Sequence, residues 1–151
     1  IAGAWVGKKA GNAWKAMAIA TGFVAIPMAV MAVMTNSGAS IAIYFVAIAI
    51  TGIAESFRAV SITPTAQGML APEDMGVGTA LVNFANSLAG TIAAAVFAVA
   101  YNANTASDPT NAALIQSGVK SVFCTAAVVL AIGLLLVLFV VKPQMSKKEA
   151  K

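Results

Sequence analysis

The chain has 151 residues, of which 60% are hydrophobic and 9% charged, whereas an ordinary soluble domain is about 45–50% apolar and about 25% charged. Too few polar side chains are present to cover a soluble globule, so we expect a membrane protein. The formal net charge is +4, but the lysines flank apolar runs and form no stripe with stacking aromatics, so we expect no nucleic-acid partner.

The residue types that are present or absent narrow the range of possible functional sites further. Cys124 is the single cysteine and no histidine is present. An internal disulfide, a histidine metal site and imidazole-based catalysis are therefore excluded. No nucleophile–base pair with a third orienting group is evident. We expect no catalytic residues, no metal ligands, no cofactor and no enzyme activity.

Four apolar runs follow one another along the chain, at 16–34, 41–63, 79–101 and 121–141. As α-helices they would be about 28 to 34 Å long, which matches a hydrocarbon core of about 30 Å. Strands of a membrane barrel would be shorter and would alternate polar with apolar residues, and none of these runs does. We therefore predict an all-α polytopic membrane bundle with four transmembrane helices over 16–141.

The segments outside the runs indicate the orientation. Residues 1–15 contain three lysines and residues 142–151 contain four, whereas the connections between the runs contain only Lys120. Under the positive-inside rule, 1–15 is a cytoplasmic basic loop and 142–151 a cytoplasmic basic tail, in a protein of the cell membrane. The first run is longer than the core of a signal peptide. The chain begins at Ile1 in what resembles the middle of a loop, and we interpret it as a fragment.

Proline interrupts the first run at Pro27. It cannot donate a hydrogen bond to the carbonyl of Phe23, so we predict a helix kink at Pro27. Two interpretations stay open, because proline is common in membrane helices and also marks bends beside moving pathways.

Glu55 and Arg58 are the charged residues of the second run. Three positions apart, they share a helix face and can pair. They lie about 21 and 25 Å from the start of the run, in its cytoplasmic third. A carboxylate in a poorly solvated site can load and release a proton, which makes the two residues proton-coupling candidates. Alternatively, Arg58 snorkels to the headgroups and Glu55 neutralises it.

The third run carries polar and small residues on one helix face at spacings of three and four. We call it the Asn83 face, and it comprises Asn83, Asn86, Ser87, Gly90, Ala94 and Ala98. Its last three members have the small-xxx-small spacing that lets membrane helices approach closely, so we predict helix packing there. Because amides facing lipid would lack partners, we expect the face to point into a bundle. Its polar residues either bond to another helix or line a substrate pathway.

The stretch ITPTAQGMLAPEDMGVGTALVNFANSLAGTIAAAVF resembles multidrug efflux carriers of the drug:proton antiporter type, in the major facilitator superfamily. In those carriers a proline-containing helix end and a loop with acids precede a small-residue helix, which often carries Arg-Gln-Leu-Gly-Gly. The matching positions here are Asn86, Ser87, Leu88, Ala89 and Gly90, so the arginine and the first glycine of the pair are absent.

Two further stretches are similar to the same superfamily. GAWVGKKAGNAWK resembles its basic cytoplasmic loop, with Gly7 where the usual acid stands, and GVKSVF resembles the entry to its final helix. The resemblance implies the last four helices of the C-terminal half of a major facilitator fold.

Such carriers use a proton gradient to export lipophilic small molecules, with substrate near the midplane. The implied partners are the lipid bilayer, substrate and protons, and the missing N-terminal helices of the same transporter. The alternative is a self-sufficient four-helix membrane protein that acts as an oligomeric small exporter or scaffold subunit.

Overall fold

The computed structural model describes residues 12–35, 40–67 and 70–144, which are helical apart from short connections. The predicted all-α class is confirmed, and these ranges contain no strand. The elements are α2 (Asn12–Met34), α3 (Ile41–Gln67), the 3₁₀ turn η1 (Pro72–Asp74), α4 (Met75–Thr105), α5 (Ala112–Leu136) and the π-helical turn η2 (Val137–Val141).

All four predicted runs lie in helices that are long and apolar enough to cross a membrane. The corresponding spans are Trp14–Met34, Ile41–Thr63, Pro72–Thr105 and Ala112–Gln144. The chain therefore has the secondary structure of a multi-pass membrane protein.

The helices extend beyond the apolar runs, most clearly around the connection expected between 101 and 121. There the structure has only a short turn, because α4 continues to Thr105 and α5 already begins at Ala112. Asn111 caps α5, since its Oδ1 accepts hydrogen bonds from the N–H of Ala113 at 3.0 Å and of Leu114 at 3.4 Å. Such a cap satisfies helix N–H groups that have no intrahelical partner.

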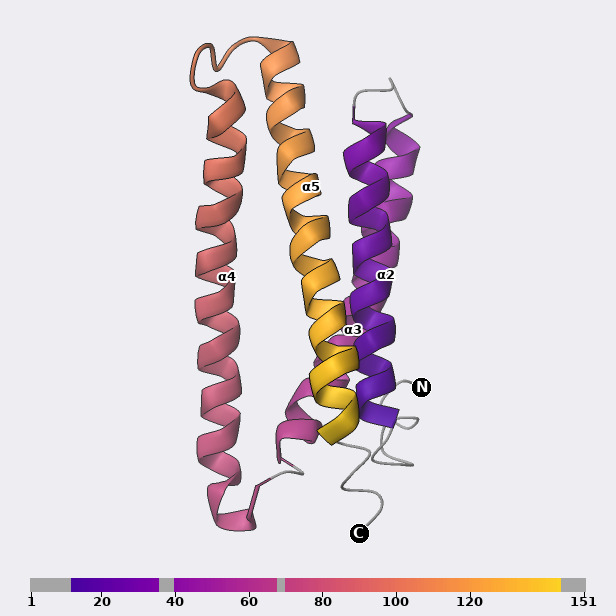
Figure 1. The fold of residues 1–151 in the computed structure, drawn as a ribbon, viewed down its shortest axis with the longest axis vertical. Coiled ribbons are helices and arrows are strands. Elements are labelled where there is room, and N and C mark those ends of the chain that lie inside the picture. The colour runs from indigo at the N-terminus through magenta and orange to yellow at the C-terminus, as the bar shows by residue number, and fades with distance from the viewer. Residues whose placement is uncertain (1–11, 36–39, 68–69, 145–151) are drawn as a thin grey trace.

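The spatial order of the helices differs from their chain order (Figure 1). Helix α2 packs against both α3 and α5, and α4 packs against α5 and, more weakly, α3. The buried core is built mainly of alanine: Ala16, Ala20, Ala32, Ala47, Ala54 and Ala126. Small side chains let helix backbones approach closely, which is how helices pack in a membrane.

Large apolar side chains project outward rather than into this core. Phe45 is 68% exposed, and Phe139 is 74% exposed. A soluble protein rarely shows apolar surface on this scale, whereas lipid tails solvate it well. The packing therefore agrees with the composition.

Two glutamine side chains connect neighbouring helices at opposite ends of the molecule. Gln67, at the end of α3, donates from Nε2 to Oγ1 of Thr79 in α4 at 2.8 Å. Gln116 of α5 donates from Nε2 to the carbonyl oxygen of Thr35, which directly follows α2. Thr35 is 8% exposed, so this contact satisfies a polar group that is shielded from solvent.

Candidate functional site

Glu55 and Arg58 form a two-pronged ion pair on α3, as their spacing predicts. Nε of Arg58 donates to Oε2 of Glu55 at 2.7 Å, and Nη2 donates to Oε1. The side chain of Arg58 is 43% exposed and that of Glu55 is 50% exposed. The pair is thus satisfied internally but open on one side, where a proton, a cation or a headgroup could reach it.

The polar part of the Asn83 face is uncovered. Every residue from Asn83 to Ile92 is exposed, so no other described element shields any side of α4 over this stretch. Within the described residues, neither Asn83 nor Asn86 uses its amide in a side-chain hydrogen bond. The structure therefore leaves two amides inside a membrane-spanning helix without a partner from the described chain.

The small residues of the Asn83 face are uncovered as well. Ala94 and Ala98 are exposed, and a Cβ added at Gly90 would meet no atom within 4 Å. The helix packing predicted for these residues therefore does not occur within the described chain. The reason is geometric, because α4 contacts α5 near the turn that joins them and stands apart from it toward its own start (Figure 1).

Sequence reasoning missed the contact that joins α4 to α5. Asn104 donates from Nδ2 to Oγ of Ser121 at 2.8 Å, and Ser117 donates from Oγ to Oδ1 of Asn104 at 3.1 Å. Beside them, Gly118 is buried against Tyr101. Asn104, Ser117 and Gly118 fall between the last two apolar runs, in the segment that the sequence predicts to be a connection. Tyr101 and Ser121 are the residues at which those runs end and begin.

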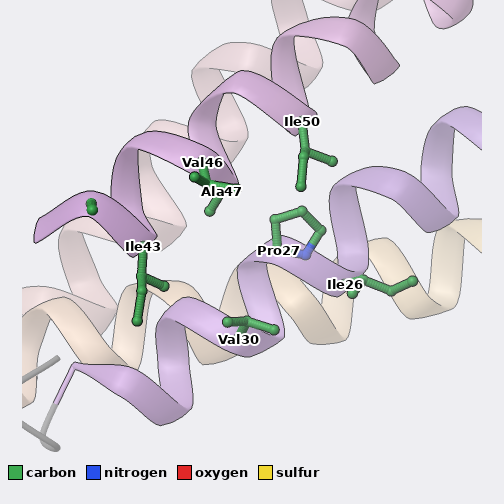
Figure 2. Close-up of a pocket in the computed structure, with 8 residues that line it drawn as sticks. Ile26, Pro27, Val30, Ile43, Val46, Ala47 and Ile50 are labelled. Atoms are coloured by element: carbon green, nitrogen blue, oxygen red, sulfur yellow. The ribbon is translucent and has the colours of Figure 1, made fainter. Parts of the chain in front are cut away.

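Pro27 lies inside α2, which continues past it to Met34. The predicted kink stays a prediction, but the surroundings of the ring are clear, since Figure 2 shows it directed toward α3. It helps to line an open groove of about 300 Å³ whose walls are entirely apolar. The lining residues are Ile26, Pro27, Val30, Ala42, Ile43, Val46, Ala47 and Ile50.

The remaining chemistry-bearing residues form no cluster in the parts of the chain that the structure describes. No group of three or more His, Cys, Asp or Glu side chains could hold a metal ion there. Cys124 is exposed on α5. Gly7, at the position of the acid in the similar carriers, lies outside the described residues.

Comparison of the chain with protein-family models, with curated proteins and with solved structures finds no match.

Proposed function

We propose that the chain is the C-terminal part of a proton-coupled secondary transporter of the major facilitator type, which exports drugs or other amphipathic small molecules. The observation that carries the proposal is the uncovered Asn83 face. Polar groups in hydrocarbon require partners. The missing N-terminal helices and the substrate would supply those partners for Asn83, Asn86 and Ser87.

Glu55 is the candidate for proton coupling, and Arg58 is the residue that neutralises its charge. The ion pair is exposed on one side of α3 and lies within a membrane span. Ionisable residues at such positions commonly mark ion and proton pathways. The proton gradient would drive the cycle, so the proposal requires no cofactor and no enzyme chemistry.

The proposed location is the cell membrane, with both ends of the chain cytoplasmic. The lysines support this orientation, because seven of the eight lie in the terminal segments. Helix α2 begins, and the helical segment through η2 ends, at the same end of the molecule (Figure 1). The positive-inside rule then assigns that end to the cytoplasm.

The test is drug export by the complete transporter, measured as a function of external pH. Glu55→Gln should abolish proton-coupled export while the amount of protein in the membrane is unchanged. Glu73→Gln is the matched control, because Glu73 is exposed in η1 and has no assigned role. Export by Glu55→Gln with an unchanged pH dependence would remove Glu55 from the coupling role.

A second candidate function is supported by the same uncovered face, which a second copy of this chain could cover. The chain would then be a self-sufficient four-helix subunit of an oligomeric exporter or scaffold. In a Cys124→Ser background, Asn86→Cys should form disulfide-linked dimers in membranes if two copies meet there. Monomers only, together with active drug export by a longer protein, would favour the carrier.

A further inference from the structure

Two lysines from distant parts of the chain meet one indole ring. Nζ of Lys15 lies 5.9 Å from the ring centroid of Trp14, and Nζ of Lys142 lies 5.2 Å from the same centroid. An ammonium group within about 6 Å of an indole centroid is attracted by the ring. Both lysines are exposed, and Trp14 is half-buried. We call these three residues the Trp14 cluster.

Among the described residues, no acid forms an ion pair with the lysines of the Trp14 cluster. Within the described ranges, the only ion pair joins Glu55 to Arg58. The first turn of α2, where Lys15 lies, contains no acidic residue.

The backbone departs from α-helical geometry directly before Lys142. Over Val137–Val141 the chain forms a π-helical turn, and the N–H of Lys142 donates to the carbonyl oxygen of Val137, five residues earlier. Each residue of a π turn advances less around the axis than in an α-helix, so the turn changes the direction in which Lys142 projects. Turns of this kind are rare in proteins, and those that do occur are often found at functional sites. Here η2 packs against α2, which carries Trp14.

The Trp14 cluster lies near the ends of two candidate membrane spans, where lipid headgroups are expected. Trp14 begins the span of α2, and Lys142 lies two residues before the end of the last span at Gln144. Tryptophan and lysine are favoured at this level of a bilayer. Basic pockets between membrane helices bind the headgroups of anionic lipids.

We propose that Trp14, Lys15 and Lys142 bind the phosphate group of an anionic phospholipid in the leaflet at this end of the molecule. The ammonium groups of Lys15 and Lys142 would neutralise the phosphodiester, and the indole of Trp14 would keep both ammonium groups at the same site. A zwitterionic headgroup brings its own ammonium group and matches the site poorly. This inference does not depend on the proposed transport function, because none of the three residues belongs to the transport candidates.

The test measures lipid retention by the full chain in detergent, using native mass spectrometry with added phosphatidylglycerol or phosphatidylcholine. The wild-type chain should retain phosphatidylglycerol in preference to phosphatidylcholine. Lys15→Gln and Lys142→Gln should each lower its apparent affinity about fivefold, and the double variant about 25-fold, since each lysine near an anionic headgroup contributes about that factor. Lys142→Arg should restore most of the binding.

Lys120→Gln is the matched control, because it removes one positive charge from α5 outside the Trp14 cluster. The lysines at positions 8, 9, 147, 148 and 151 stay in every variant, so general attraction between the basic termini and the lipid is held constant. Equal retention of the two lipids, or an equal loss in Lys120→Gln and Lys142→Gln, would overturn the proposal. Inorganic phosphate should not compete at equal concentration; if it displaces the lipid, the site binds free phosphate and the assignment to a lipid is wrong.

Discussion

Asn104 and Ser121 bridge α4 and α5, with Nδ2 of the amide 2.8 Å from Oγ of the serine. Ser117 completes the contact by donating to Oδ1 of the same amide. One asparagine therefore contacts two turns of the facing helix, at the end of α4 where the two helices approach each other.

Asn104→Leu should loosen this contact. Hydrogen bonds between membrane helices contribute about 0.6 kcal/mol on average and at most about 1.7 kcal/mol, so we expect a loss of about 1 to 2 kcal/mol in the free energy of unfolding. Denaturation in mixed detergent micelles measures it. Asn102→Leu, at an exposed position of the same helix, is the control, and an equal loss in both variants would contradict a specific bridge.

Gly118 provides the space that Tyr101 occupies. A Cβ at Gly118 would lie 2.8 Å from Cδ2 of Tyr101 and 3.0 Å from Cγ2 of Thr105. Gly118→Ala should therefore destabilise the protein by about 1 to 3 kcal/mol through overpacking, despite the higher helix propensity of alanine.

The control for Gly118→Ala is Gly133→Ala, on the same helix. There the new Cβ would meet only Cγ2 of Thr21, at an ordinary 3.9 Å, so the variant should be neutral or stabilised by up to about 1 kcal/mol. Thermal denaturation in detergent compares the two. The double variant Gly118→Ala/Thr105→Ser should recover part of the loss, because it removes the close contact with Cγ2 of Thr105.

Asn83→Leu and Asn86→Leu separate the two interpretations of the Asn83 face. If the amides contact substrate, each variant should change the ratio of resistance to two drugs about tenfold, the effect of losing a hydrogen bond of about 1.4 kcal/mol. If they bond to another helix, folded protein should be lost while the surviving fraction keeps its selectivity. Ala85→Leu adds the same side chain on the opposite side of α4 and should do neither.

Asp108 gives the turn between α4 and α5 a defined pH dependence. The hydroxyl of Thr110 donates to its Oδ1 at 2.7 Å and the N–H of Thr110 donates at 3.0 Å, and these bonds hold the pKa of the Asp108 carboxyl below its usual value. The bonds favour the ionised form, so their contribution is complete above the ordinary pKa of about 4. This contribution to the stability of the turn is lost as the pH falls through the lowered pKa that Asp108 has in the folded state.

The backbone amides of residues 106–108, 110 and 111 should therefore be equally protected from hydrogen exchange from pH 7 to about pH 5, after correction for the intrinsic rates. They should lose protection only below about pH 4. Asp108→Asn keeps an acceptor oxygen and should remove this pH dependence. Loss of protection between pH 7 and 5 in the wild-type protein would show that another group controls the turn.

Local properties of the sequence predicted much of the fold. Hydropathy over one helix length located all four spans, and a spacing of three was sufficient to pair Glu55 with Arg58. The positions at which the helices begin and end were harder to predict from the sequence. Asn104 and Ser117 are polar residues of the kind that occurs in loops, and they become helical here because each satisfies the other across two helices.

Contacts between distant segments could not be predicted. Trp14 and Lys142 are separated by almost the whole chain. No pattern in this sequence predicts the π-helical turn that sets the direction of Lys142. The Asn83 face was correctly placed on one helix, since its spacing is a local property. Which element covers it depends on the arrangement of whole helices, and within the described chain none does.

The spatial order of the helices has a consequence for biosynthesis. Helix α2 can pack on its first partner, α3, as soon as the next span is made, but its second partner, α5, is the last of these four helices to leave the ribosome. Helix α4 must enter the bilayer before the helix on which it mainly packs exists. During that interval Asn104 lacks its partners on α5, so a chain cut short before α5 should be an early target for membrane proteases.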